Sequence, residues 1–114
     1  MRSTGPTADV RDQVAERSAG LCERCGQEWA AQIHHRRPRG AGGSRLPDTN
    51  SLSNLLHICA QCHAWIESFR EQALALGWLV RQGNSPAEIP VSYRGELRWL
   101  QPDGGVDYHA ADAV

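Results

Sequence analysis

The sequence predicts a small α+β domain braced by a metal ion. Two segments of the 114-residue chain space their apolar residues as amphipathic helices do, one near the start and one ending near residue 76. Short alternating apolar runs near the end of the chain, separated by glycine-rich turns, are typical of antiparallel strands. Four cysteines form two Cys-x2-Cys pairs. A chain of this length is expected to build one domain around a modest core.

The first predicted helix covers residues 7–19. Asp9 is its expected N-cap, and Val10 and Val14 share one face. Gly20 follows directly, and a glycine at this position is typical of a helix that ends in the left-handed backbone conformation.

The middle of the chain predicts two strands, a loop and a second helix. Residues 29–35 favour a strand, the Gly-, Pro- and Ser-rich stretch 38–50 a loop, and 52–58 a turn followed by a short strand. The second helix begins near the second cysteine pair, runs to about Leu76 and ends at Gly77. Its expected buried face consists of Trp65, Ile66, Phe69, Ala73 and Leu76.

The last part of the chain predicts a further β element. Between residues 89 and 108, short alternating runs are interrupted by Arg94-Gly95 and by a Pro-Asp-Gly-Gly turn, which favours a β-hairpin or meander. We therefore expect a core over residues 1–83 and a C-terminal β extension with its tail over 84–114.

The cysteine pairs Cys22/Cys25 and Cys59/Cys62 predict a structural Zn²⁺ site. Two residues between thiols let both sulfurs turn toward one point, and two such knuckles supply the four thiolates of a closed tetrahedral site. The 33 residues between the pairs (26–58) exceed the usual zinc-ribbon gap of about 15–20. Two disulfides or two redox motifs are the alternatives, but the chain shows neither an export signal nor a βαβ pattern.

Charge is distributed unevenly along the chain. All twelve basic residues are arginines, and thirteen acids bring the formal net charge to −1. Residues 29–83 hold six arginines against three acids, whereas residues 84–114 hold two arginines against five acids. The stretch 29–47 contains four arginines and no acid, so it is either a cationic face for phosphate or an ordinary solvated loop.

A further pattern lies between and around the cysteine pairs. It consists of Ile33-His34-His35-Arg36-Arg37-Pro38, then Gly42-Gly43-Ser44, then Asn54-Leu55, and His63 directly after the second pair. In type, order and spacing these residues resemble the HNH endonuclease family, whose ββα-metal fold is often braced by paired zinc knuckles. The resemblance covers roughly residues 10–76, with the motif region at 22–76. It implies two strands joined by a crossing loop and followed by a helix that carries the last histidine.

The resemblance implies a role for each motif residue. His35 matches the general base that takes a proton from the attacking water, and the backbone oxygen of Asn54 or Leu55 is the expected group that orients it. His34 and His63 match ligands of a catalytic divalent metal ion. Asn54 matches the motif asparagine, which either touches this metal or holds the loop.

The resemblance also implies the chemistry. One divalent ion (Mg²⁺, Mn²⁺ or Ni²⁺) would polarise the scissile phosphate, and the products would carry 5′-phosphate and 3′-hydroxyl ends. Many relatives carry Asp where this chain has His34, so a donor set of His, Asn and His lacks a carboxylate. Because imidazole ligands favour Mn²⁺, Ni²⁺ or Zn²⁺ relative to Mg²⁺, we expect Mn²⁺ or Ni²⁺ to support cleavage at least as well as Mg²⁺.

Other residues are expected to be structural or solvent-exposed. His57 lies in the predicted second strand, off the motif, and His109 lies in the polar tail. Trp65 and Phe69 are expected in the core rather than stacked on bases. Asn50 is a rival to the motif asparagine, but it lacks the Leu-Leu-x-Ile-Cys sequence that follows the preferred residue.

The resemblance favours a metal-dependent DNA endonuclease of low sequence specificity. At least two of four arginines beside the expected base should grip DNA phosphates: Arg36, Arg37, Arg39 and Arg45. One alternative is a zinc-braced nucleic-acid-binding module without catalysis. Another is an accessory protein beside a phage terminase large subunit, because the lysine-free, arginine-rich composition resembles small HNH proteins of actinobacterial phages.

Membrane and export functions are not indicated. No apolar run approaches the roughly 20 residues that span a bilayer, and the first residues lack the apolar stretch of a signal peptide. We therefore expect a cytoplasmic protein with DNA as partner and no membrane contact.

Overall fold

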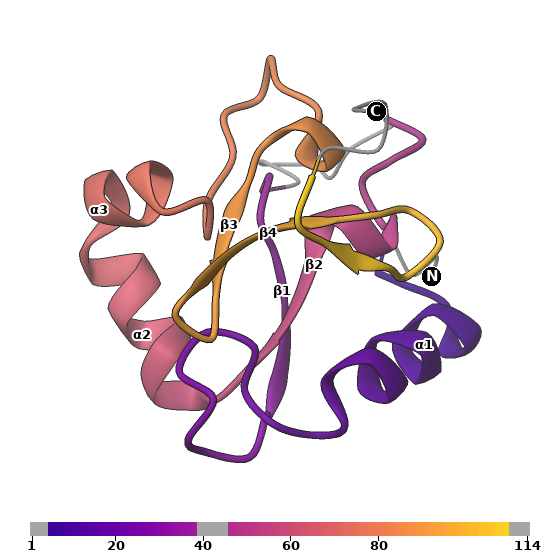
Figure 1. The fold of residues 1–114 in the computed structure, drawn as a ribbon, viewed down its shortest axis with the longest axis horizontal. Helices are drawn as coiled ribbons and strands as arrows, with labels where there is room; N and C mark the ends of the chain where they lie inside the picture. Colours follow the sequence, from indigo (N-terminus) through magenta and orange to yellow (C-terminus); the bar gives the residue numbers. More distant parts are fainter. Residues whose placement is uncertain (1–4, 39–45, 110–114) are drawn as a thin grey trace.

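A computed structural model describes residues 5–38 and 46–109 (Figure 1). The helices are α1 (Ala8–Ser18), α2 (Ala60–Ser68) and α3 (Arg70–Ala75), with short 3-10 turns η1 (Leu52–Asn54) and η2 (Pro86–Glu88). The strands are β1 (Gln32–His35), β2 (Leu55–Ile58), β3 (Val91–Tyr93), β4 (Glu96–Leu100) and β5 (Val106–Asp107). The α+β prediction is therefore confirmed. Among the described residues, no helix is both long enough and apolar enough to cross a bilayer.

Helix α1 begins two residues earlier than Asp9 indicated. Thr7 is the N-cap, and its side chain accepts a hydrogen bond from the Val10 amide at 3.3 Å. Asp9 lies instead in the first turn, where its negative charge favours the helix dipole. The helix ends as expected, because Ala19 and Gly20 both adopt positive φ angles, of 56° and 80°.

The centre of the molecule is the antiparallel hairpin of β1 and β2, in which His34 faces Leu56 and His35 faces Leu55. Helices α1 and α2 lie on opposite sides of this hairpin (Figure 1). Strand alternation sends Leu56 into the larger apolar cluster with α2, whereas Leu55 joins the smaller cluster with Val14 of α1. Adjacent residues of β2 therefore pack against different helices, on opposite faces of the hairpin.

The predicted second helix is two helices. At Phe69 the backbone takes φ −123° and ψ 60°, which interrupts the helix between α2 and α3. The prediction that Phe69 and Leu76 are buried is wrong, because these side chains are 45% and 41% exposed. The break turns Phe69 away from the core and leaves its ring against Trp65, at 4.9 Å between centroids. Gly77 ends this region at φ 80°.

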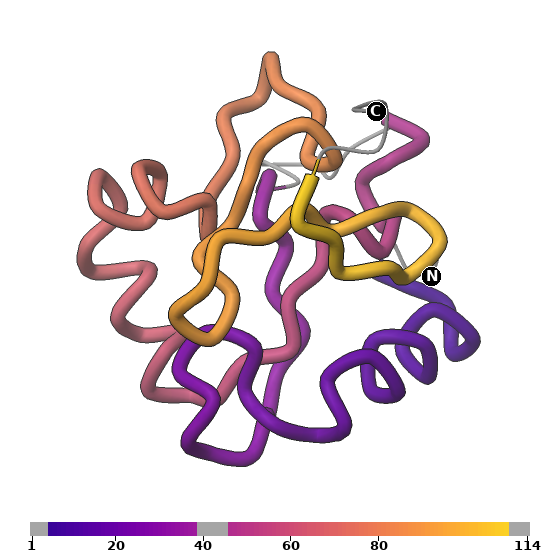
Figure 2. The backbone as a smooth tube through the Cα atoms, viewed as in Figure 1, coloured from indigo at the N-terminus to yellow at the C-terminus, as the bar shows by residue number. Residues whose placement is uncertain are grey.

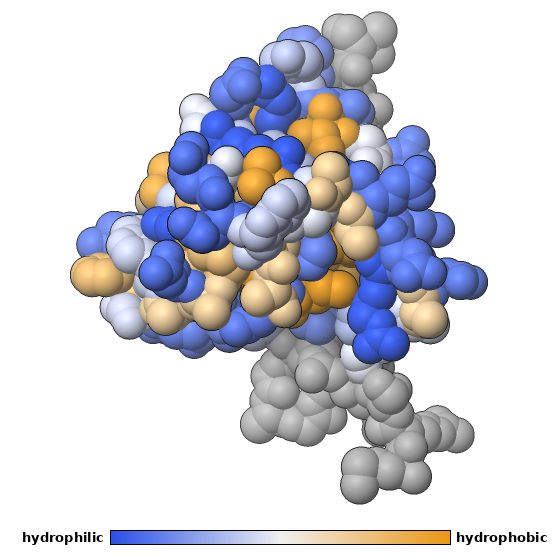
Figure 3. Space-filling model, turned by 90° about the horizontal axis from the view of Figure 1, so that it is seen from below, coloured by the Kyte–Doolittle hydropathy of each residue, from blue (hydrophilic) through white to orange (hydrophobic). Residues whose placement is uncertain are grey.

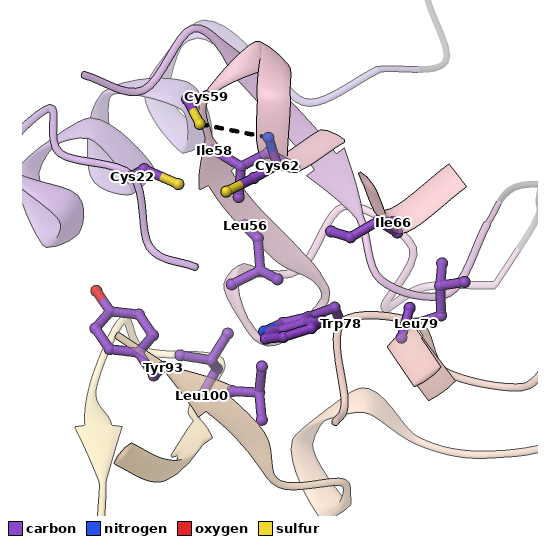
Figure 4. Close-up of a cluster of buried hydrophobic side chains, with 12 residues drawn as sticks. Cys22, Leu56, Ile58, Cys59, Cys62, Ile66, Trp78, Leu79, Tyr93 and Leu100 are labelled. Carbon is purple, nitrogen blue, oxygen red and sulfur yellow. Dashed lines mark hydrogen bonds between the residues drawn. The ribbon is translucent and has the colours of Figure 1, made fainter. Parts of the chain in front are cut away.

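The C-terminal strands form an antiparallel meander in the order β3-β4-β5. The meander crosses in front of the hairpin in the backbone trace (Figure 2). Its residues Val91, Tyr93 and Leu100 pack in the same apolar cluster as Cys22 and Leu56 (Figure 4). This part of the extension therefore contributes directly to the core that carries the cysteines.

A buried ionic network joins α1, the first knuckle, β2 and the meander. The fully buried Glu23 carboxylate accepts two hydrogen bonds from Arg17, at 2.8 and 2.9 Å. It also accepts from the Tyr93 hydroxyl at 2.6 Å and from the His57 amide at 2.7 Å. A buried carboxylate needs such partners, so the network holds four elements in one arrangement.

Candidate active site and metal centre

The four cysteines meet at one point. Their sulfur atoms all lie within 4.8 Å of one another, so the cluster could hold a metal ion. Cys22 and Cys25 come from the loop after α1, whereas Cys59 caps α2 and Cys62 lies in its first turn. Figure 4 shows Cys22, Cys59 and Cys62 together at the edge of the apolar cluster. Four sulfur donors are the usual set for structural Zn²⁺.

Arg24 lies between this cluster and two tryptophans. Its Nη1 donates to the Cys62 sulfur at 3.1 Å, and its guanidinium carbon lies 4.2 Å from the ring centroids of both Trp65 and Trp78. Burial raises the pKa of Cys62 to about 12, so zinc binding must displace the proton. The Arg24 charge then offsets part of the negative charge that four thiolates bring.

A second cluster lies on the α2 side of the hairpin. Ligand atoms of His34, His63 and Glu67 all lie within 4.8 Å of one another. His34 comes from β1, and the other two lie one turn apart on α2, with 3.8 Å between His63 Nε2 and Glu67 Oε1. The His34 and His63 rings are 5.6 Å apart. Strand and helix thus bring together the two histidines that sequence motifs singled out.

The surroundings of His34 suit a neutral metal ligand. The ring is buried, and its Nε2 lies 2.8 Å from the Trp78 carbonyl oxygen. Because a carbonyl only accepts, Nε2 carries the proton and Nδ1 keeps the lone pair that a metal needs. Burial lowers the pKa of His34 to about 4, so the imidazole is neutral at pH 7.

Glu67 is the residue that sequence reasoning missed. Its signal was the spacing of four residues from His63 on one helix, which places both side chains on the same face. The Glu67 carboxylate also accepts from Arg70 at 3.2 Å, through Oε2. The cluster therefore offers two imidazoles and one carboxylate, whereas the donor set expected from the sequence has no carboxylate.

His35 is the last residue of β1, and its Nε2 lies 2.8 Å from the Asn50 side-chain oxygen. The two backbone carbonyls that were expected to orient His35 each accept a hydrogen bond from an arginine. The Asn54 carbonyl accepts from the Arg36 amide at 2.8 Å, and the Leu55 carbonyl accepts from Arg17 at 2.6 Å. The side chain that contacts His35 is thus that of Asn50, the asparagine that the sequence motif did not favour.

Asn54 holds the loop. Its side chain is fully buried, and backbone groups occupy both ends of its amide. Its Oδ1 accepts from the Arg37 amide at 2.7 Å, and its Nδ2 donates to the carbonyls of Arg37 and Thr49 at 3.2 and 2.8 Å. These contacts fit the role of holding the loop rather than that of a metal ligand.

The comparisons with known proteins agree with this arrangement. The family model of the HNH endonuclease matches residues 22–66, which include both cysteine pairs, His34, His35 and His63. Residues 22–66 are thus similar to an HNH endonuclease domain. A search of curated proteins and a search of solved structures each gave no match.

Within the matched region, Arg36 is not placed to contact DNA, so that prediction is wrong. The side chain is fully buried, and it donates to the carbonyls of Gly77, Ser53, Pro86 and Ile89 at 2.8–3.0 Å. Burial lowers the pKa of Arg36 to about 9, which still leaves it charged at neutral pH. The arginine joins the hairpin to the C-terminal part of the chain.

Arg37 is also buried, and the phosphate contact predicted for it is not supported by its position. Its side chain pairs with the Asp48 carboxylate and donates to the Asn84 carbonyl at 2.9 Å. Arg37 lowers the pKa of Asp48 through this hydrogen-bonded pair. The other two predicted arginines, Arg39 and Arg45, lie outside the described residues.

The remaining histidines of the chain lie where the sequence indicated. His57 is half-buried, and its Nδ1 lies 2.7 Å from the Ser18 hydroxyl, which ties β2 to α1. His109 is exposed in the tail. Neither residue belongs to a metal-ligand cluster among the described residues.

Proposed function

We propose that this HNH protein is a metal-dependent DNA endonuclease in which one divalent cation binds at His34, His63 and Glu67. The single observation that carries the proposal is this second cluster, because both of its histidines belong to the region that matches the HNH endonuclease model. Two neutral imidazoles and a carboxylate fit a divalent cation well, and they favour Mn²⁺, Ni²⁺ or Zn²⁺ relative to Mg²⁺. When bound, the cation would stabilise negative charge on the scissile phosphate and the leaving oxygen.

His35 is the proposed general base. Its Nε2 faces the Asn50 amide oxygen, which only accepts, so this nitrogen carries the proton. Nδ1 is then left as the basic nitrogen that can take a proton from water. Asn50 holds the ring and its tautomer, and Asn54 acts one step further away by holding the loop after the strand.

Cleavage of supercoiled plasmid tests the proposal. The zinc-loaded wild type is expected to nick plasmid with Mn²⁺ or Ni²⁺ at least as fast as with Mg²⁺. His35→Ala and His63→Ala should each lower the rate by at least about 100-fold, within the usual contribution of a general base or metal. Because His109 is exposed and lies outside both clusters, His109→Ala is the matched control and should keep the wild-type rate.

One result would contradict the proposal, and a second would remove the evidence that the variants give for it. Plasmid that stays intact with all three cations would favour a zinc-braced nucleic-acid-binding module without catalysis. Equal loss of activity in His109→Ala and His35→Ala would show that the assay reports folding rather than chemistry. Zinc content and circular dichroism of every variant separate these cases.

A role in phage DNA packaging is a narrower proposal that rests on the composition of the chain. The protein has twelve arginines and no lysine, which resembles small phage HNH proteins. Co-purification with a terminase large subunit would support this role. Nicking activity without any such association would leave the endonuclease proposal standing and remove the packaging role.

A further inference from the structure

A groove of about 540 Å³ lies between α3 and the segment that follows it. We call it the α3 groove. Its polar rim is formed by Arg70, Glu71, Arg81 and Gln82, and its apolar part by Pro38, Leu74, Leu79 and Val80. The rim therefore presents two guanidinium groups and one carboxylate to a ligand, and the ion pair of Arg70 with Glu67 adds a second carboxylate beside it.

The α3 groove adjoins the proposed cation site. Arg70 on its rim donates to Glu67 at 3.2 Å, and Glu67 is a member of the cluster with His34. The groove also reaches the end of the hairpin, because Gln82 donates to the Pro38 carbonyl at 2.6 Å. It therefore extends from beside the cluster to Pro38.

The two arginines of the groove differ from those buried elsewhere. The guanidinium groups of Arg36 and Arg37 donate to internal carbonyls and to the Asp48 carboxylate, so they cannot reach a ligand. The Arg70 side chain is 53% exposed, and among the described residues its only hydrogen bond and ion pair is with Glu67. Arg81 is exposed, and within residues 5–38 and 46–109 its guanidinium has no hydrogen bond or ion pair.

We propose that the α3 groove binds the phosphate backbone of DNA beside the scissile phosphate, with Arg70 and Arg81 as the contacting side chains. The proposal rests on the nuclease function proposed above and names where its substrate lies. Forked guanidinium groups suit phosphate oxygens, and such contacts position DNA without reading its sequence. The apolar floor of Leu74 and Val80 suits the sugar faces between phosphates.

A second hollow is the rival location. It has a volume of about 490 Å³ on the α1 side of the hairpin, and Arg11, His35 and His57 line it. Arg11 is exposed, like Arg81, so its removal deletes the same charge from the protein surface. Arg11→Ala is therefore both the matched control for charge and the test of the rival.

Binding of a fluorescent 20-base-pair duplex, measured by anisotropy with Ca²⁺ in place of the catalytic cation, tests the proposal at several salt concentrations. Arg81→Ala and Arg70→Ala should each raise Kd about fivefold or more on any sequence. Each should also reduce the slope of log Kd against log salt concentration by about one, the mark of one lost phosphate contact. Arg81→Glu should weaken binding further, and Arg11→Ala should shift Kd less than twofold.

Arg81 decides the outcome, because Arg70→Ala also removes the ion pair of Glu67. Unchanged binding in Arg81→Ala and Arg81→Glu overturns the proposal, and a loss confined to Arg11→Ala moves the DNA to the rival hollow. A wild type that does not bind the duplex also overturns it. A wild type that binds through Arg81 but never cleaves would refute the endonuclease proposal alone, so the two failures are distinguishable.

Discussion

Arg36 shows how a residue's chemistry depends on where its side chain lies. In the sequence it stands beside the expected base in a run of arginines, which favours phosphate binding. In the structure its guanidinium is enclosed by four backbone carbonyls from three separate parts of the chain. The same planar fork of donors serves either purpose, and burial decides between them.

Replacing Arg36 with Met should therefore destabilise the protein rather than weaken DNA contacts. Four carbonyls lose their donor, three of them in buried hydrogen bonds. Unsatisfied buried acceptors cost about 1–3 kcal/mol each in the worst case, so we expect a total loss of about 3 kcal/mol or more. Urea unfolding of the zinc-loaded protein measures it. Arg11→Ala removes an exposed arginine and should change the free energy of unfolding by less than about 0.5 kcal/mol. Similar values for both variants would refute the structural role.

At the scale of elements, α2 connects the two candidate metal sites. Its first turn carries Cys62 of the cysteine cluster, and its next turns carry His63 and Glu67 of the second cluster. A helix places residues four apart on one face, which brings the carboxylate to the imidazole. The break at Phe69 then starts α3, so that Arg70 reaches back to Glu67 and also lines the groove.

Glu67→Gln is expected to weaken Mn²⁺ binding to the zinc-loaded protein by at least about tenfold, because a neutral amide replaces a charged ligand. Isothermal titration calorimetry gives the affinity. Glu71→Gln removes the same charge four residues further along, outside the cluster, and should leave the affinity within about twofold. An unchanged affinity in Glu67→Gln would exclude the carboxylate from the cation site and leave only the histidines.

At the scale of the whole molecule, the cysteine cluster lies where distant parts of the chain meet. Arg94 at the β3–β4 turn donates to the carbonyls of Ser18, Leu21 and Cys22 at 2.7–3.2 Å. The apolar cluster beside the cysteines includes Leu100 of the meander (Figure 4). On the face seen in Figure 3, apolar side chains form only a broken patch among hydrophilic ones. The fold thus concentrates its modest apolar core next to the four cysteines.

Removal of zinc should consequently unfold the whole chain in one transition rather than loosen only one knuckle. A strong chelator is expected to lower the Tm sharply, because four thiolates join residues 22–25 to 59–62 and metal binding supplies folding free energy. Thermal unfolding followed by circular dichroism checks this, and restored Zn²⁺ should return the original Tm. A Tm that does not respond to the chelator would show that the apolar core suffices.

Local pattern was enough to predict the features that depend on short spacing. The cysteine pairs, the two strands around His35 and Asn54, and the meander follow from turn chemistry and alternation, which act over a few residues. His34 and His63 were likewise identifiable, because their type and spacing belong to a motif.

The tertiary structure decided everything that depends on which distant groups share a layer. Packing buries Arg36 and Arg37 and leaves Phe69 exposed. It also brings the His35 ring against the Asn50 side chain and the Glu67 carboxylate against His34 and His63. It also formed the α3 groove from Arg70 and Arg81, which lie on either side of a helix end. These outcomes follow from burial and from satisfying buried polar groups, which are properties of the packed chain and not of any local window.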